Sequence, residues 1–265
     1  MSFDTLVIDG DSLIYRCGFA AKDEPVENCL HSFKLQVQRI EEECACFLTR
    51  MYIKGKGNFR DTLAVTQKYK GNRTQPPPEH YEAIKEYALE YQKAECVDGM
   101  EADDMCSVEL YANRNKDSGF VLAALDKDLW NTPGWHYNYG RGTTEYVTLE
   151  QANLNFIRQM LTGDYSDNIP GLPRILDPKQ TDEHVIKMIK VGPKTADKVL
   201  EGMGSKEAMR TVWEAYKKYG EYQCMTQEET LAYFVEQGRL LWMTRHLNAD
   251  GSPVLWEPPA FLFKE

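Results

Sequence analysis

Short apolar runs and helix-period patterns alternate through the first half of the chain. Residues 5–9 and 120–125 are short runs of apolar and β-branched side chains, which predicts two buried strands. Residues 62–66 predict a third strand, although a run of five residues also fits a turn of helix. Residues 27–51 carry apolar side chains at helical spacing, so we expect one long helix there.

Glycine and proline separate the elements that follow. The segment 69–79 contains a glycine and three consecutive prolines, which predicts an irregular loop. Helices are expected over 79–94 and from the acidic start at 100–104 onward. The segment 135–147 predicts either a hairpin around Gly140-Arg-Gly142 or a pair of edge strands.

The pattern becomes mostly helical after about residue 150. The expected helices cover residues 151–162, 182–190, 193–202, 205–218 and 227–239. Alternating strands and helices followed by helices predict an α/β fold, with a mostly parallel sheet flanked by helices and a C-terminal helical lobe. We place the division between residues 1–155 and residues 156–265. Ligands of such sheets bind outside the carboxyl ends of the strands.

Composition indicates an ordinary globular chain. Apolar residues make up 42% of it, and no apolar run approaches the roughly 20 residues that a membrane span needs. The segment Met1-Ser-Phe-Asp4 does not begin a basic-then-apolar signal, so we expect a cytoplasmic location and no membrane partner. The seven cysteines include no CxxC pair and predict reduced thiols rather than a zinc site.

The net charge of −10 weighs against a nucleic-acid partner, because nucleic acids are polyanions. However, nine acidic residues fall in compact groups, and without them the acidic and basic residues of the chain nearly balance. Carboxylates held so close together repel one another unless a cation neutralises them. The excess of negative charge is therefore consistent with a metal site. The nine acids are Asp9, Asp11, Glu101, Asp103, Asp104, Asp126, Asp128, Asp164 and Asp167.

Position along the predicted elements brings several of these acids together. Asp9 and Asp126 directly follow predicted strands, so parallel strands would place both at one edge of the sheet. Glu101 and Asp104 are three residues apart and share one face of a helix, whereas Asp126 and Asp128 share one side of extended chain. Oxygen ligands of this kind suit Mg²⁺ or Mn²⁺.

Two such ions about 4 Å apart polarise a scissile phosphate and generate a water nucleophile, which predicts phosphodiester hydrolysis. Each acidic pair alone also fits a helix cap or a turn. Asp11, followed by Ser12, is better explained as a cap than as a ligand.

Six motifs, in this order, resemble the flap endonuclease family, and the bacteriophage 5′–3′ exonuclease branch is the nearest. The resemblance covers roughly residues 5–202. The motifs are Val7-Ile-Asp9-Gly, Tyr69-Lys-Gly-Asn-Arg73, Glu101-Ala-Asp-Asp104, Asp126-Lys-Asp128, Gly163-Asp-Tyr-Ser-Asp-Asn-Ile-Pro-Gly171 and Gly192-Pro-Lys-Thr-Ala196.

The resemblance implies a PIN-like sheet and two divalent ions, Mg²⁺ or Mn²⁺. The implied ligands of the first ion are Asp9, Glu101, Asp103 and Asp104, and those of the second are Asp126, Asp128, Asp164 and Asp167. Lys70 and Arg73 match the basic pair at the base of the family's helical arch, expected over about 67–98, and Arg16 matches an arginine facing the site. Without the resemblance, Lys70 and Arg73 would be ordinary loop charges.

The segment from Asp164 to Leu200 resembles the helix-three-turn-helix unit that grips duplex DNA. Amides at a helix start suit a phosphate. The implied DNA-binding residues are Lys190, Gly192, Lys194 and Thr195, and the family often holds a K⁺ ion at this turn. A plain helical hairpin is the alternative.

Two departures from the family pattern stand out. The family has a further metal-site Asp after its second strand, but with 62–66 as that strand Gln67 takes its place, and Asp61 is a poor substitute. An insert at 174–189 also precedes the turn, with Lys190 at its first glycine position, which weighs against K⁺. The insert either extends the DNA-binding surface through Arg174, Lys179, Lys187 and Lys190 or is a solvated excursion.

The predicted function is hydrolysis of phosphodiester bonds near DNA 5′ ends, by exonuclease or flap cleavage. The expected partner is duplex DNA with a 5′ end, nick or flap, with RNA in RNA–DNA hybrids as a second substrate, and the location is the host bacterial cytoplasm if a phage encodes the chain. Two alternatives remain: a catalytically silent DNA-binding relative and a metal-dependent phosphatase. Tyr81, Tyr87 and Tyr91 either stack on single-stranded bases or pack a helix.

Overall fold

The computed structural model describes residues 3–177 and 187–264. The chain forms two compact units, and each is described by itself. Unit 1 comprises Met1–Phe59, Thr74–Ala152 and Met243–Val254, and unit 2 comprises Arg60–Arg73, Asn153–Trp242 and Leu255–Glu265.

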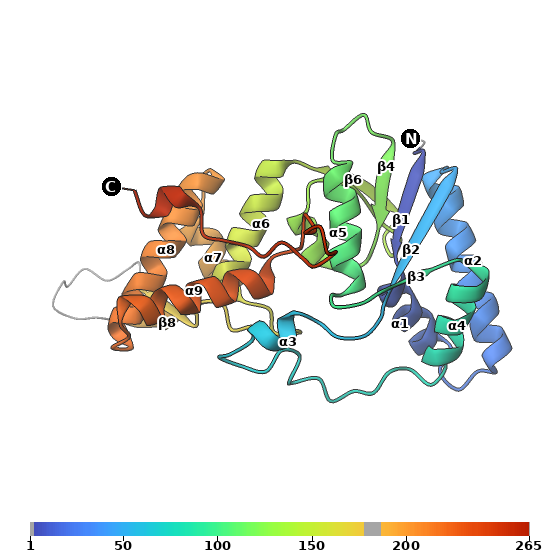
Figure 1. Cartoon of the computed structure of the whole chain (residues 1–265), viewed down its shortest axis with the longest axis horizontal. Helices are drawn as coiled ribbons and strands as arrows, with labels where there is room; N and C mark the ends of the chain where they lie inside the picture. The colour runs from blue at the N-terminus through green and yellow to red at the C-terminus, as the bar shows by residue number, and fades with distance from the viewer. Residues whose placement is uncertain (1–2, 178–186, 265) are drawn as a thin grey trace. The chain divides into compact units, whose positions relative to one another are not determined.

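Unit 1 is built on one mostly parallel sheet (Figure 1). Its strand order is β3-β2-β1-β4-β5-β6, with every neighbouring pair parallel except β5 and β6, which form the predicted hairpin. The strands are β1 (Thr5–Asp9), β2 (Leu48–Lys54), β3 (Glu95–Val97), β4 (Phe120–Ala123), β5 (Gly134–Asn138) and β6 (Thr143–Val147).

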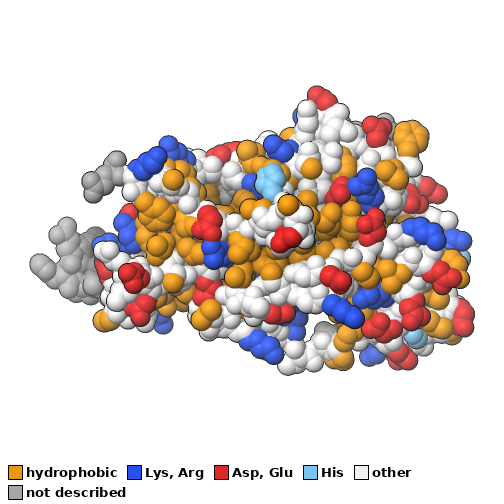
Figure 2. All heavy atoms as spheres, viewed as in Figure 1, with side chains coloured by type: hydrophobic (Ala, Val, Ile, Leu, Met, Phe, Trp, Pro, Cys, Tyr) orange, Lys and Arg blue, Asp and Glu red, His pale blue; other side chains and the backbone are white. Residues whose placement is uncertain are grey.

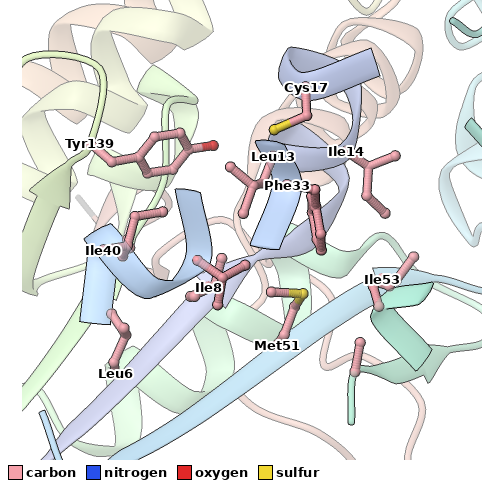
Figure 3. Close-up of a cluster of buried hydrophobic side chains, with 14 of the residues drawn as sticks. Leu6, Ile8, Leu13, Ile14, Cys17, Phe33, Ile40, Met51, Ile53 and Tyr139 are labelled. Atoms are coloured by element: carbon pink, nitrogen blue, oxygen red, sulfur yellow. The ribbon is translucent and has the colours of Figure 1, made fainter. Parts of the chain in front are cut away.

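Helices cover both faces of this sheet, because the side chains of its strands alternate between two apolar clusters. Leu6 and Ile8 of β1 belong to the cluster with α1, α2 and α4, whereas Val7 belongs to the cluster with α5. Figure 3 shows Leu6, Ile8 and neighbouring side chains in the first cluster. The helices are α1 (Gly10–Ala20), α2 (Val26–Cys44), α4 (Tyr81–Tyr91), α5 (Ala102–Ala112) and the 3-10 helix η1 (Lys127–Asn131). The predicted α/β architecture is confirmed.

Unit 2 is mainly helical. Its apolar core includes the fully buried Tyr216 and Phe234, which lie edge to face. Its elements are α3 (Arg60–Leu63), most of α6 (Leu149–Thr162), β7 (Arg174–Leu176), β8 (Met188–Lys190), α7 (Pro193–Val199), α8 (Ser205–Tyr222), α9 (Gln227–Leu241) and the 3-10 helix η2 (Ala260–Leu262). Within the described ranges, no helix is long and apolar enough to span a bilayer.

The prediction of one helix over 27–51 was wrong at its C-terminal end. Helix α2 stops at Cys44, and Ala45 takes the left-handed conformation that ends it. The chain then enters β2, whose Leu48–Lys54 segment pairs in parallel with β1. Pairing with β1 therefore overrode a helical pattern that continued through Met51.

The strand predicted at 62–66 is also absent. Residues 60–63 form the short helix α3 in unit 2, and Val65 is 85% exposed. The sheet position next to β1 belongs to β2, so the second strand ends at Lys54 and not before Gln67. The residue that stands in place of the family's metal-site Asp is therefore Lys54 and not Gln67.

The segment 174–190 begins and ends as a hairpin. β7 pairs with β8 in antiparallel fashion, so the helix predicted over 182–190 is wrong for Met188–Lys190. Residues 182–186 of that prediction, together with Lys179, lie outside the described residues. Lys187 pairs with Asp177 at 2.8 Å.

Two of the three tyrosines of α4, Tyr81 and Tyr87, pack against rings of other helices. Tyr87 stacks on Tyr91 and meets Phe33 edge to face, and Tyr81 meets Tyr15 in the same way. These contacts agree with the packing alternative for Tyr81 and Tyr87, whereas Tyr91 remains 61% exposed.

Charged side chains of both signs are mixed over the face drawn in Figure 2, where Lys and Arg lie among Asp and Glu. This distribution agrees with the near balance of charge outside the grouped acids.

Gly10 allows the start of α1 to approach β2. A Cβ atom at this position would lie 2.6 Å from the carbonyl oxygen of Tyr52 and 2.9 Å from the Met51 side chain. We expect Gly10→Ala to lower the free energy of unfolding by about 2–3 kcal/mol, measured by urea denaturation. Gly192→Ala is the control, because nothing lies within 4 Å of its Cβ position. Equal stability of the two variants would contradict this account.

Candidate metal centre

Asp9 joins β1 to α1 at the carboxyl end of the sheet. It is the N-cap of α1, and its Oδ1 accepts a hydrogen bond from the Ser12 N–H at 3.3 Å. The side chain is only 4% exposed. Burial is the main cause that raises its pKa from 3.8 to about 7, and the nearby charges of Asp11 and Asp126 add to the rise.

Asp11 is not the cap that its sequence context suggested, because Asp9 has that role. Asp11 lies in the first turn of α1 and reaches β2, where its Oδ2 accepts a hydrogen bond from the Lys54 N–H at 3.1 Å. Its Oδ1 is buried and has no hydrogen-bond partner among the described residues. Burial raises the pKa of Asp11, and the charge of Glu101 contributes.

Glu101, Asp103 and Asp104 open α5. Glu101 is the N-cap and forms a capping box with Asp104, while Asp103 lies in the first turn. Glu101 is 7% exposed, and its Oε1 lies 3.7 Å from the Nζ of Lys54. Asp104 is fully buried, and its Oδ1 accepts hydrogen bonds from the backbone and hydroxyl of Thr244. Asp104 therefore also anchors the Met243–Val254 segment of unit 1.

Asp126 and Asp128 differ from the predicted geometry. β4 ends at Ala123, three residues before Asp126, and Asp126 caps the 3-10 helix η1 by accepting from the Asp128 N–H at 2.9 Å. Asp126 itself is extended, but Asp128 lies in the 3-10 helix, so the two acids do not share one side of an extended chain. Lys127 lies 3.4 Å from Asp128.

The acids of unit 1 repel one another. The charges of Asp11 and Asp126 contribute to the raised pKa of Asp9, and the charge of Glu101 contributes to that of Asp11. No three acid, Cys or His side chains in the described part of the chain are already arranged to hold a metal ion. The donors fit a hard cation nonetheless, because they are carboxylates, burial raises the pKa of Asp9 and of Asp11, and the buried Oδ1 of Asp11 has no hydrogen-bond donor among the described residues.

Asp164 and Asp167 belong to unit 2 and lie in a closed turn between Gly163 and Gly171. Backbone hydrogen bonds of 2.8 Å join Asp164 and Ile169 in both directions. Gly163 and Gly171 have positive φ values of 64° and 60°, and a Cβ on either would lie 2.2 Å from backbone atoms of the turn. Both glycines are therefore needed to close the turn.

Lys70 and Arg73 both pair with Asp167 within unit 2. The Nη2 of Arg73 lies 2.5 Å from Asp167 Oδ1, and the Nζ of Lys70 lies 3.6 Å from Oδ2. The hydroxyl of Tyr69 donates to the same Oδ2 at 2.6 Å, and the Lys70 N–H donates to the Asp167 carbonyl. Lys70 holds a φ of 52°, which is unusual for a residue with a side chain. The 69–73 loop thus gathers positive charge around one predicted ligand.

Arg16 is exposed on α1. The same helix presents Ser12, whose hydroxyl lies 3.0 Å from the Tyr139 hydroxyl. In Figure 3 the ring of Tyr139 points toward α1. The Nη1 of Arg16 lies 3.7 Å from the Cβ position built on Gly140, so Arg16 lies beside the residue that follows Tyr139.

The predicted DNA-binding residues lie at the start of α7 in unit 2. Gly192 is the N-cap, and the Thr195 N–H donates to its carbonyl at 2.9 Å. Lys194 and Lys190 are exposed, the latter at the end of β8.

Sequence reasoning assigned Asp11 to a cap and missed Lys54 and Tyr69. Lys54 stands at the end of the strand over 48–54. This strand was not predicted, because the apolar pattern up to Met51 is that of a helix. Tyr69 stands within the quoted Tyr69–Arg73 motif, yet nothing in the sequence pairs it with Asp167.

Comparisons with known proteins support the resemblance. No protein-family model matches the chain. It is 28% identical over 228 residues to DNA polymerase I of Bacillus caldotenax, which covers 76% of the chain and 24% of that relative. It is 25% identical over 190 residues to a 5′-3′ exonuclease of Buchnera aphidicola, covering 64% of the chain and 66% of that relative. The chain spans about a quarter (24%) of the length of the DNA polymerase I relative.

Solved structures show the fold. T5 5′-exonuclease with bound zinc has a TM-score of 0.58 at 16% identity, covering 91% of this chain and 90% of that one. A pseudo-enzyme-product complex of the T5 flap endonuclease with DNA and metal ions has a TM-score of 0.55 at 16% identity, covering 89% of each chain. The chain has the fold of T5 5′-exonuclease, and the resemblance to the flap endonuclease family is confirmed.

The raised pKa of Asp9 has a consequence for stability. The folded carboxyl holds a proton up to about pH 7, whereas the unfolded one loses it near 3.8, so the free energy of unfolding falls as pH rises between these values. We expect Asp9→Asn to stabilise the protein in EDTA at pH 8 by about 2–4 kcal/mol, with little effect at pH 4, measured by urea denaturation.

The exposed Asp117 provides the control, because Asp117→Asn removes one carboxylate without relieving burial. A loss of stability for Asp9→Asn at pH 8 in EDTA would show that burial of the Asp9 charge carries no such cost.

Proposed function

We propose that this chain, which has the flap endonuclease fold, is a metal-dependent 5′ nuclease that hydrolyses phosphodiester bonds near DNA 5′ ends. The observation that carries the proposal is the group of buried, mutually repelling carboxylates at the carboxyl end of a parallel sheet, where α/β folds bind ligands. The T5 relative supports it, since that protein is a flap endonuclease described in complex with DNA and metal ions.

The proposed ligands in unit 1 are Asp9, Glu101, Asp103 and Asp104 for a first divalent ion, with Asp126 and Asp128 directed to a second; unit 2 supplies Asp164 and Asp167 as further candidates. We assign Mg²⁺ or Mn²⁺ to these oxygen donors. When bound, such ions polarise a phosphate, activate water and stabilise the leaving oxygen. Asp9 and Glu101 are preorganised for this task because each is fixed as a helix N-cap.

Lys70 and Arg73 are proposed to bind the scissile phosphate. Their pairing with Asp167 holds both side chains in one place, where an entering phosphate competes with the carboxylate for the same donors. Arg73 is suited to bidentate contact with phosphate oxygens, whereas Lys70 contributes a point charge. Arg16 is proposed as a third cation that contacts the substrate.

The duplex is proposed to bind through the turn before α7. Gly192 leaves its surroundings open for close backbone approach, and Lys194 and Lys190 supply exposed charge. Thr195 offers a hydroxyl at the same turn. This turn and the helices around it are the proposed helix-three-turn-helix unit. Binding of K⁺ at the turn is less favoured, because Lys190 stands where the family has a glycine.

A 5′-labelled duplex incubated with Mg²⁺ should release mono- or short oligonucleotides, and it should stay intact in EDTA. Asp126→Ala should lower the cleavage rate by about 100-fold or more, because it removes a proposed ligand. Asp117→Ala, which changes an exposed acid, should cleave like the wild type. Blunt, nicked, flapped and RNA–DNA hybrid substrates then establish which ends are preferred.

The alternatives give different results in the same assay. DNA that is bound and never cut with either Mg²⁺ or Mn²⁺ would identify a silent DNA-binding relative. Turnover of p-nitrophenyl phosphate with intact duplex would identify a phosphatase.

Lys194→Ala should weaken duplex binding and reduce the slope of log affinity against log salt by about one unit, because one phosphate contact is lost. Fluorescence anisotropy at several KCl concentrations measures both quantities. Lys218→Ala is the matched control, since Lys218 is another unit 2 lysine that instead pairs with Glu221 at 3.2 Å. An unchanged salt slope for Lys194→Ala would remove the turn from the DNA-binding surface.

A further inference from the structure

The strand next to β1 ends without an acid. β1 ends at Asp9 and β4 leads to Asp126, but β2 ends at Lys54, followed by Gly55 and Lys56. Parallel pairing places Asp9 opposite Tyr52, so the end of β2 lies beside the end of β1. The family pattern places a metal-binding carboxylate at the end of this strand. In this chain, another element must supply that carboxylate to the first ion.

We infer that Asp11 supplies this carboxylate, as a ligand of the first divalent ion that replaces the acid missing from β2. The inference rests on the proposed function and extends it by one residue. Asp11 reaches the end of β2 from α1, because its Oδ2 accepts the Lys54 N–H at 3.1 Å. Asp11 of α1 thus brings a carboxylate to the end of β2, where the strand itself has Lys54.

The two oxygens of Asp11 have different surroundings. Oδ2 is held by β2, which fixes the direction of the carboxylate, whereas Oδ1 is buried without a hydrogen-bond partner among the described residues. A buried carboxylate oxygen without a donor is unfavourable, and a bound cation removes that penalty. Glu101, a proposed ligand, contacts the same lysine through its Oε1, 3.7 Å from the Nζ of Lys54, so both carboxylates lie at the end of β2. A cation held by Glu101 there would also satisfy the buried oxygen of Asp11.

Two lysines, Lys54 and Lys85, meet at the end of β2 beside this carboxylate. The Nζ of Lys54 lies 3.7 Å from Glu101, and the Nζ of Lys85 donates to the Lys54 carbonyl at 2.9 Å. Both lysines also stabilise the charged form of Asp11. Two fixed cations therefore reduce the repulsion between Asp11 and Glu101 without occupying the free Oδ1.

A purely structural role is the rival explanation, in which Asp11 only ties α1 to β2. The Asp11→Asn substitution distinguishes the structural role from the ligand role. Its amide oxygen still accepts the hydrogen bond from the Lys54 N–H, whereas the negative charge is lost. Asp98→Asn is a matched control: the Oδ1 of Asp98 also accepts a backbone N–H just after β2, from Lys56 at 2.7 Å, but Asp98 is exposed.

The test is Mn²⁺ binding to the full chain without DNA, measured by isothermal titration calorimetry, together with thermal unfolding in EDTA. We expect Asp11→Asn to weaken Mn²⁺ binding by about 10-fold or more while leaving the melting temperature in EDTA unchanged or raised. Asp98→Asn should bind Mn²⁺ like the wild type.

Unchanged Mn²⁺ affinity in Asp11→Asn would overturn the inference and leave the proposed function intact, provided that the wild type binds Mn²⁺. A lower melting temperature in EDTA with unchanged affinity would assign Asp11 to the structural tie. If the wild type itself binds no Mn²⁺, the proposed function fails first, and the inference fails with it.

Discussion

Parallel pairing of β1 with β2 on one side and β4 on the other determines which side chains meet at the carboxyl end of the unit 1 sheet. Successive strands of a parallel sheet point the same way, so the residues that follow them share one edge. Asp9 reaches this edge from β1 and Asp126 follows β4, while the start of α1 turns Asp11 toward β2. The close approach of Gly10 to Tyr52 makes that turn possible. The candidate centre thus depends on backbone geometry before any charge is considered.

Electrostatic repulsion is the cost of this arrangement. Burial and neighbouring carboxylates raise the pKa of Asp9 to about 7, so the protein is less stable with this charge than without it. Helix caps offset part of the cost, because Asp9 and Glu101 each accept hydrogen bonds from the amides of the helix they start. Such tension between stability and a charged site is common at functional centres.

Unit 2 holds its acids by a different method. Two glycines with positive φ close the turn around Asp164 and Asp167, and the 69–73 loop surrounds Asp167 with a lysine, an arginine and a tyrosine hydroxyl. Here the charge of the carboxylate is balanced by neighbouring cations rather than left to repulsion. The two cations proposed to contact phosphate are therefore already gathered at one site within unit 2.

The sequence by itself determined the residues that carry the chemistry and most of the regular elements. Buried strands such as β1 and amphipathic helices such as α8 follow from local patterns of apolar residues, and the acids are recognisable because they stand beside element ends. Only the tertiary structure decided that Leu48–Lys54 is a strand, that residues 60–63 are a helix, and that Asp11 joins β2 instead of capping α1. A short segment with both propensities takes the structure that its neighbours complete, and for β2 that neighbour was β1, which lies some forty residues earlier in the chain.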